Sequence, residues 1–266
     1  MKRNGIFSDL VCDYDFEKNV NGEDTYSEQM IGKIKVEYLK IRSAEYEKIL
    51  NKRSGDYVSI HFEDICTLSI EEEDELISVL ACEMRKFSVK DDPSVLVVGI
   101  GNSDFVADSL GSRSVQKLAV KENGRIYSAS VDISERTGIE SADFVVGISS
   151  VVAPDMVVLI DSVVTKSEER LSRTIQLSDS GISPGSGLGA VKKTIDRDTV
   201  GVAVLTVGVP TVIDSRSMIL NHLDELEIDS FDRFPAKKLF LTPHSIDFVI
   251  ERFAYVIARA IEKAFS

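Results

Sequence analysis

The stretch Val95-Leu96-Val97-Val98-Gly99-Ile100 decides the fold of this chain, together with a second stretch, Met156-Val157-Val158-Leu159-Ile160. Both stretches are short, rich in β-branched residues and without polar alternation, which is typical of parallel strands buried on both faces. Further strands are predicted at residues 125–131, 174–177 and 200–209. Helical patterns alternate with these strands, which predicts an α/β protein with three α/β/α layers and a mostly parallel sheet.

The composition indicates a globular protein with an acidic surface. The 266 residues are 43% hydrophobic and carry a formal net charge of −13. Nucleic-acid binding needs a basic footprint, and an acidic surface is repelled by anionic membranes, so we expect neither partner. The three cysteines form no Cys-x-x-Cys motif, and the N-terminus lacks the apolar region of a signal peptide. No apolar run reaches the roughly 20 residues that span a bilayer. These features predict a cytoplasmic protein.

We expect one large domain after a polar N-terminal arm. Residues 1–30 are polar and acidic without periodicity, which predicts a mobile arm. Residues 31–65 predict a β-α-β extension, and residues 31–266 together form a single domain. The segment 141–148 is ambiguous between helix and strand. The last helix is expected to begin at Thr242-Pro243, as an N-cap with proline at the first helical position, and to run to near the C-terminus.

Two aspartates lie just beyond the buried strands. Asp108 comes after the first stretch, before the next helix, and Asp161 directly follows the second stretch. Ligands of open α/β sheets bind beyond the carboxyl ends of the strands, which is where both residues are predicted to lie. A structural alternative makes Asp108 a helix cap and Asp161 a turn former. As a close pair, the two would share one proton and supply the general acid and general base that amide hydrolysis needs.

A glycine-rich segment follows the predicted strand at residues 174–177. Residues 177–189 hold four glycines and a proline, so this loop needs positive φ at several points. Its spacing matches neither dinucleotide-binding nor Walker motifs, and it is not a nucleophile elbow. The loop therefore either positions a substrate or is a plain turn. The candidate substrate-positioning residues are Asp179, Ser180, Gly181, Ser183, Gly185 and Gly187.

Other kinds of catalytic site lack their residues in this sequence. The three histidines, His61, His222 and His244, form no His-Glu-x-x-His motif, and no Cys/His cluster has zinc spacing. Nothing supports a Ser-His-Asp triad around them. We therefore expect neither a metal nor another cofactor, and a carboxyl pair is the best enzymatic interpretation.

Several motifs, in the same order along the chain, resemble the spore germination protease family. One such motif would be weak, but the ordered set is specific. The motifs are Gly99-Ile100-Gly101-Asn102, Asp108-Ser109-Leu110-Gly111, Thr137-Gly138-Ile139-Glu140, Pro154-Asp155 leading into Ile160-Asp161, residues 177–189, residues 208–214, and Leu241-Thr242-Pro243 with the last helix.

The resemblance implies a function and a site. It implies an endopeptidase, without a metal, that degrades the small acid-soluble proteins of spores during germination, with Asp108 and Asp161 as the catalytic pair. It also implies a phosphorylase/hydrolase-like fold shared with the hydrogenase-maturation proteases, a homotetramer, and a location in the forespore or spore core.

The resemblance further implies a zymogen that loses a short N-terminal piece. The matching bond joins Asp9 and Leu10, so the expected pro-segment is residues 1–9. Three departures stand out, and the first is that this pro-segment is only about nine residues long. The region between Asp214 and Leu241 is much shorter than in better-known members, which bears on oligomeric contacts. Ser183 stands where those members carry histidine, which bears on activity and its pH dependence.

Two other interpretations remain open from the sequence. One is a metal-assisted maturation-type protease in which Asp108 and Asp161 are ligands, although carboxylates alone suit hard cations better than nickel or zinc. The other is a non-catalytic sporulation paralogue that uses the same fold as a binding module.

Overall fold

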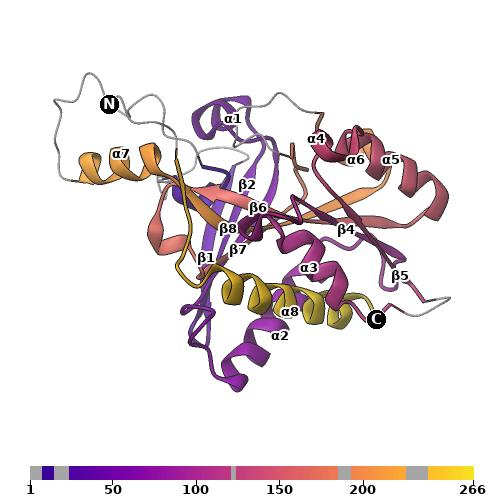
Figure 1. Ribbon diagram of the computed structural model, residues 1–266, viewed down its shortest axis with the longest axis horizontal. Coiled ribbons are helices and arrows are strands. Elements are labelled where there is room, and N and C mark those ends of the chain that lie inside the picture. The colour runs from indigo at the N-terminus through magenta and orange to yellow at the C-terminus, as the bar shows by residue number, and fades with distance from the viewer. Residues whose placement is uncertain (1–7, 15–23, 121–123, 185–192, 226–238) are drawn as a thin grey trace.

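The computed structural model describes residues 8–14, 24–120, 124–184, 193–225 and 239–266, which form a layered α/β domain (Figure 1). The described strands make one nine-stranded sheet in the order β1-β2-β3-β7-β8-β6-β4-β5, with β9 paired to β8. They are β1 (Thr25–Ile31), β2 (Ile34–Ile41), β3 (Gly55–His61), β4 (Val95–Ile100), β5 (Ile126–Val131), β6 (Met156–Thr165), β7 (Thr174–Ser178), β8 (Ala203–Asp214) and β9 (Phe240–Leu241).

The sheet has a parallel half and an antiparallel half. Strands β5, β4, β6 and β8 are parallel neighbours, whereas β1, β2, β3 and β7 pair antiparallel and extend the sheet beyond β8. Only Gly32 and Lys33 join β1 to β2, which is too short for a parallel crossover. The predicted α/β class is confirmed, with a mixed sheet whose parallel strands are the two stretches quoted first and their neighbours.

Helices cover both faces of the sheet. The main ones are α1 (Ala44–Leu50), α2 (Ile70–Arg85), α3 (Leu110–Lys117), α5 (Ser141–Val152), α7 (Ser215–Glu225) and α8 (Ile246–Phe265), with the short turns α4 (Ser134–Thr137) and α6 (Arg197–Val200) and the 3-10 helices η1 (Val11–Asp13), η2 (Val106–Asp108) and η3 (Glu168–Arg170). No described helix is long and apolar enough to cross a membrane.

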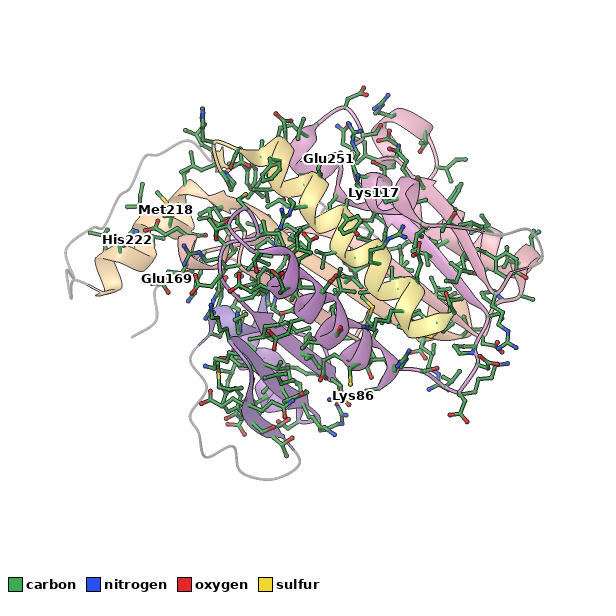
Figure 2. The ribbon with its side chains drawn as sticks, turned by 90° about the horizontal axis from the view of Figure 1, so that it is seen from below. Lys86, Lys117, Glu169, Met218, His222 and Glu251 are labelled. Carbon is green, nitrogen blue, oxygen red and sulfur yellow. The ribbon has the colours of Figure 1, made fainter. Side chains whose placement is uncertain are left out.

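One face is covered by α2, α3 and α8. Phe253 of α8 is fully buried there and meets Phe62 edge-on, with 6.0 Å between the ring centroids. Figure 2 shows α8 lying across this face, with Glu251 near Lys117 of α3; their charged groups are 2.6 Å apart. The core therefore locks α3, the helix that follows Asp108, against the sheet and α8.

The opposite face is covered in two parts. Helix α5 covers the parallel half, where Leu96 and Val98 of β4 pack with Val145. Helix α1 and the 3-10 helix η1 cover the antiparallel half, in a cluster that contains Val11 and Leu50. Between the two coverings, over the middle of the sheet, lies a pocket.

The structure corrects three expectations and decides one that the sequence left ambiguous. Residues 1–30 are not one free arm: Ser8–Tyr14 and Asp24–Met30 belong to the described fold, and Leu10 and Val11 are buried because they pack on the sheet. The segment 141–148 is helical. The last helix begins after Ser245 rather than at Thr242, whose hydroxyl donates to the Thr211 carbonyl at 3.1 Å instead.

The last correction concerns the position of Asp161. Strand β6 does not end at Ile160 but continues to Thr165, because β8 goes on pairing with it as far as Ile213. Pairing with β4, in contrast, stops at Gly99 opposite Ile160. Asp161 therefore lies inside β6. It is the first residue of β6 that no longer pairs with β4.

Candidate active site

The pocket on this face has a volume of about 700 Å³ and collects residues from distant parts of the chain. It lies beyond the end of β4 and over β6, β7 and β8. Its lining includes Asp9, Lys52, Arg53, Asn102, Asp108, Asp161, Ser162, Gln176, Ser178, Ser180, Gly181, Ser183, Thr206, Gly208 and Thr211.

Strand alternation explains why polar side chains from β7 and β8 line part of the pocket. On β7, Ile175 and Leu177 enter the core beneath α8, so Gln176 and Ser178 face the other side. On β8, Val207 enters the same core, whereas Gly208 and the flanking Thr206 line the pocket. Gly208 pairs with Asp161 in register, and having no side chain it leaves space beside that carboxyl group.

Asp108 lies at the end of η2 and is held by the loop after β4. Its Oδ2 accepts a hydrogen bond from the Asn102 backbone N–H at 2.7 Å. The loop comes this close because Gly101, at φ +131°, has no Cβ: one placed there would lie 2.1 Å from the Asp108 carbonyl oxygen. Helix α3 has Ser109 at its N-cap and no side-chain cap bond. The helix-cap alternative for Asp108 is therefore wrong.

Asp161 is the most buried carboxyl group of the pocket, with 6% of the residue exposed. Its Oδ1 accepts a hydrogen bond from the Ser162 backbone N–H at 2.9 Å. Burial, followed by the negative charges of Asp108 and Asp9, raises the pKa of Asp161 well above its usual range. The structure thus brings Asp108 and Asp161 to one pocket, close enough to interact, and adds Asp9 as a third carboxyl group.

The predicted processing site lies at the same pocket. The Asp9 N–H donates to the Val164 carbonyl oxygen, and Asp9 Oδ2 accepts from the Val164 N–H, both at 2.8 Å. Leu10 is fully buried and packs with Val163 and Cys12. The bond between Asp9 and Leu10 is therefore seated beside β6, a few residues along that strand from Asp161.

Two cations enter the pocket from the turn after α1, and the sequence prediction missed both. The Lys52 ammonium donates to the Ser8 carbonyl oxygen at 2.7 Å, and burial lowers the pKa of this lysine. Arg53 pairs with Asp196 at 2.6 Å. A Lys-Arg pair after a helix has no distinctive spacing, so nothing in the sequence pattern marked them.

Three hydroxyl groups in the pocket lack hydrogen-bond partners among the described residues. They belong to Ser162, Thr206 and Thr211, and each oxygen is buried. Buried polar groups normally have partners. These three oxygens are closed off from solvent, so in the described part of the chain they remain unpaired groups within the wall of the pocket.

The glycine-rich loop is only partly at the pocket. Ser180, Gly181 and Ser183 line it, and Gly181 adopts φ +76° with its α-carbon tight against Ile195. The Ser183 hydroxyl bonds that of Thr194 at 2.9 Å. The Asp179 carboxylate is turned away from the pocket and accepts from the Asp56 N–H at 2.6 Å. Gly185 and Gly187 lie outside the described residues.

The described residues contain no group of three or more His, Cys, Asp or Glu side chains arranged to hold a metal ion. The carboxyl groups of the pocket are instead occupied by backbone N–H groups: Asn102 for Asp108, Ser162 for Asp161 and Val164 for Asp9. Chemically, the arrangement offers one buried carboxyl group whose pKa is raised, beside two other carboxyl groups in the same pocket.

Comparison with known proteins identifies relatives over most of the chain. The profile of the germination protease family matches residues 13–233. A germination protease of Oceanobacillus iheyensis is 34% identical over 225 residues, which are 78% of this chain and 61% of that protein. One from Caldanaerobacter subterraneus subsp. tengcongensis is 30% identical and covers 87% of this chain and 84% of its own length.

Among solved structures, a NiFe hydrogenase maturation protease from Thermococcus kodakarensis aligns over 68% of this chain and 99% of its own, with 18% identity and a TM-score of 0.42. The decisive comparison is the one of sequence, since the family profile covers residues 13–233, well over half of the chain. The chain therefore belongs to the germination protease family.

Proposed function

We propose that this protein is an endopeptidase that uses Asp108 and Asp161 to hydrolyse small acid-soluble spore proteins during germination. The observation that carries the proposal is the placement of both carboxyl groups in one pocket of about 700 Å³, with the pKa of Asp161 raised by burial and by its neighbours. The germination proteases to which the chain is similar supply the substrate class.

In the proposed reaction, Asp161 holds the shared proton and Asp108 is the base. Asp108 takes a proton from water as the hydroxyl group adds to the peptide carbonyl carbon. Asp161 gives its proton to the departing nitrogen, and the carbon–nitrogen bond breaks. The pair titrates as a unit, so the assignment concerns where the proton resides before attack. Burial favours Asp161 for that role.

Incubation of the purified protein with a small acid-soluble spore protein tests the proposal. We expect defined fragments by intact mass, in unchanged yield when a chelator is present. Fragments that disappear in chelator would indicate the metal-assisted alternative. Binding of the spore protein without any fragments would indicate a non-catalytic paralogue.

We also propose that the chain is a zymogen that loses residues 1–9, acts in the forespore or spore core, and assembles as a tetramer. Support for the processing step comes from the Asp9–Leu10 bond, which lies at the pocket that contains the aspartate pair. N-terminal sequencing of the matured protein should begin at Leu10, and full activity of an unprocessed chain would contradict this step. Sedimentation would determine the assembly.

Lys52→Met is expected to slow processing by about tenfold or more, because hydrogen bonds from charged groups contribute about 1.5–3 kcal/mol. The lost bond is the one from Lys52 to the Ser8 carbonyl oxygen, one residue before the scissile bond. The rate at which the Leu10 N-terminus appears is the measurement. Lys52→Arg should keep much of the wild-type processing rate. The matched control, Lys48→Met, removes an exposed lysine from α1, the helix just before Lys52, and should have no effect. Equal slowing by both changes would contradict a positioning role for Lys52.

A further inference from the structure

The proposed cleavage creates a charge at a buried position. Hydrolysis adds the hydroxyl of water to the carbonyl carbon of Asp9 and hydrogen to the nitrogen of Leu10, so the products are a carboxylate and an α-ammonium group. Leu10 is fully buried, packed with Val163 and Cys12. An isolated buried ammonium is strongly unfavourable, so the new N-terminus needs an anion.

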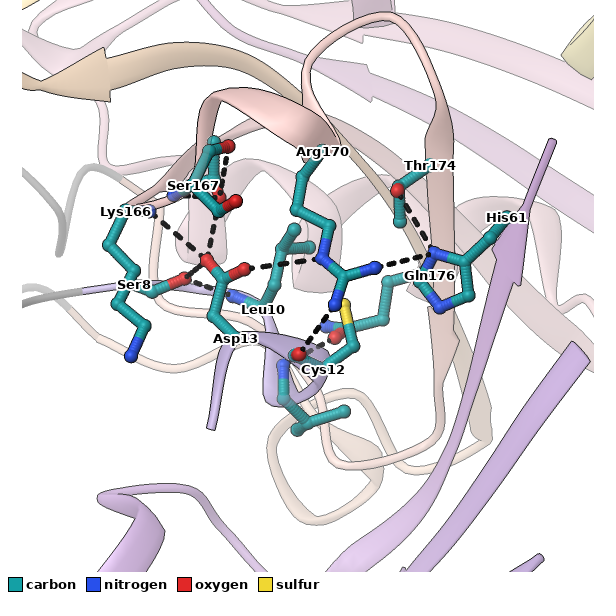
Figure 3. Close-up of polar contacts among 12 residues, drawn as sticks. Ser8, Leu10, Cys12, Asp13, His61, Lys166, Ser167, Arg170, Thr174 and Gln176 are labelled. Carbon is teal, nitrogen blue, oxygen red and sulfur yellow. Dashed lines mark hydrogen bonds and ion pairs between the residues drawn. The ribbon is translucent and has the colours of Figure 1, made fainter. Parts of the chain in front are cut away.

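A single hydroxyl group separates the Leu10 nitrogen from such an anion (Figure 3). The Leu10 N–H donates to Ser8 Oγ at 3.0 Å, and Ser8 Oγ donates to Asp13 Oδ2 at 2.5 Å. Both bonds lie within the buried segment. Ser8 belongs to the piece that cleavage removes, so its departure leaves the Leu10 nitrogen and Asp13 Oδ2 facing each other without the atom that bridged them.

Asp13 is held in place to receive that charge. Its side chain is completely buried, and Oδ2 also accepts from Thr165 Oγ1 at 2.6 Å and from the Lys166 N–H at 3.1 Å. These contacts come from the end of β6 and do not depend on Ser8. The other oxygen, Oδ1, has no hydrogen bond among the described residues, and the Arg170 Nε lies 3.6 Å from it.

The surroundings keep the segment fixed after cleavage. The Val11 N–H donates to Gln176 Oε1 at 2.7 Å, and Arg170 donates to the Cys12 carbonyl at 3.0 Å. Both contacts lie on the Leu10 side of the scissile bond. The Lys52 ammonium group loses its hydrogen-bond partner, the Ser8 carbonyl oxygen, along with the pro-segment. The new terminus therefore remains beside Asp13.

We propose that Asp13 is the receptor for the α-ammonium group of Leu10, and that this ion pair holds the processed N-terminus against β6. The inference rests on the proposed processing between Asp9 and Leu10. In the precursor, Asp13 binds the Ser8 hydroxyl; in the processed chain it binds the ammonium, at the same position. Asp13 is thus a positioning residue for the strand that carries Asp161 and Val164.

A double-mutant comparison tests this pair. Two forms are made, each with and without Asp13→Asn, and all carry Asp108→Asn so that none can cleave itself. One form is full-length. The other begins at Leu10, is released from a ubiquitin-like fusion tag by the tag's own protease, and retains every described helix and strand. Asp13→Asn should lower the Tm of the Leu10 form by at least about 5 °C more than that of the full-length form, since both forms lose the contact with Arg170 but only the Leu10 form also loses the pair with the α-ammonium group.

Asp24→Asn is the matched control. Asp24 is also a buried carboxyl group, 2% exposed, and accepts bonds from the Arg42 N–H and the Ser43 hydroxyl, so its loss should cost the two forms equally. Equal Tm losses for Asp13→Asn in both forms would overturn the proposal, as would a Leu10 chain that does not fold while the full-length chain does.

A second measurement covers the case in which Asp13→Asn prevents folding. Acetic anhydride should acetylate the Leu10 amine of the Asp13-containing protein at least about tenfold more slowly than it does the amine of an unfolded peptide beginning at Leu10. An equal rate would overturn the proposal. Failure of the wild-type chain to remove residues 1–9 is read separately by intact mass, and it contradicts the proposed processing rather than this ion pair.

Discussion

Asp108→Asn and Asp161→Asn are each expected to reduce cleavage of a small acid-soluble spore protein by about 10²- to 10⁴-fold, the usual contribution of a general acid or base. Asparagine preserves the shape of the side chain but can neither accept nor release the proton. The measurement is kcat/KM for chains that begin at Leu10, released from a fusion tag, because neither variant is expected to process itself. Asp155→Asn is the matched control: Asp155 begins the same stretch of chain but pairs with Lys90 and Ser94 away from the pocket. Activity within a few-fold of wild type in either pocket variant would refute the pair.

Asp161→Asn should also show how much the ionised form of this buried carboxyl group lowers the stability of the fold. The folded-state pKa of Asp161 is raised well above its usual value of about 3.9, so the folded protein binds this proton more tightly than the unfolded chain does. Its contribution to stability is therefore complete below about pH 3.9 and is lost as the pH rises through the folded-state pKa. Asp161→Asn should remove this loss. Thermal unfolding between acid and neutral pH should show Asp161→Asn gaining in Tm relative to wild type as the pH rises, and a lower relative Tm at neutral pH would contradict the burial argument.

Gly111→Ala is expected to destabilise the fold by about 3 kcal/mol or more, at the upper end of overpacking effects. A Cβ at this position would lie 2.4 Å from the Ile100 nitrogen and 2.6 Å from the Ile160 carbonyl oxygen. Both neighbours are backbone atoms of central strands, so neither can rotate away. Helix α3 would have to leave the sheet and carry Asp108 with it. Urea unfolding measures the loss, and cleavage activity should fall as well.

Gly147→Ala is the matched control for this change. Gly147 also lies in a helix, α5, but a Cβ there would meet nothing within 4 Å. Alanine replaces glycine in a helix with a gain of about 0.5–1 kcal/mol, so this variant should be at least as stable as wild type. If Gly111→Ala were as stable as Gly147→Ala, the close approach of α3 to β4 and β6 would not be what holds α3 in place.

The strongly patterned parts of the fold were predictable from the sequence. An unbroken β-branched run has few alternatives to a buried strand, and Val95–Ile100 forms the strand expected of it. The last helix was also predictable, because its apolar residues repeat with the period of a helix over five turns. The segment 141–148 was ambiguous, since Ser141–Val152 is apolar enough for either structure, and packing over β4 decides in favour of a helix.

The pocket was predictable only in part. Asp108 and Asp161 were found because they follow buried runs, and strand ends gather at one edge of a parallel sheet. Gln176 and Thr206 were missed although a signal exists: polar residues alternate with Ile175, Leu177, Leu205 and Val207 on β7 and β8. That alternation marks a face without an apolar cover, but it can be interpreted only once the two strands are known to be neighbours.

By itself, the sequence determined the α/β class, the parallel strands and the family, because these depend on local pattern and on motif order. The tertiary structure alone decided what surrounds the aspartates. Lys52 and Asp9 come from segments more than 100 residues before Asp161 in the chain, and they reach its pocket through the antiparallel half of the sheet and the buried segment at Leu10. Contacts between such distant residues depend on strand order and on which surfaces pack together, and no local periodicity records either one.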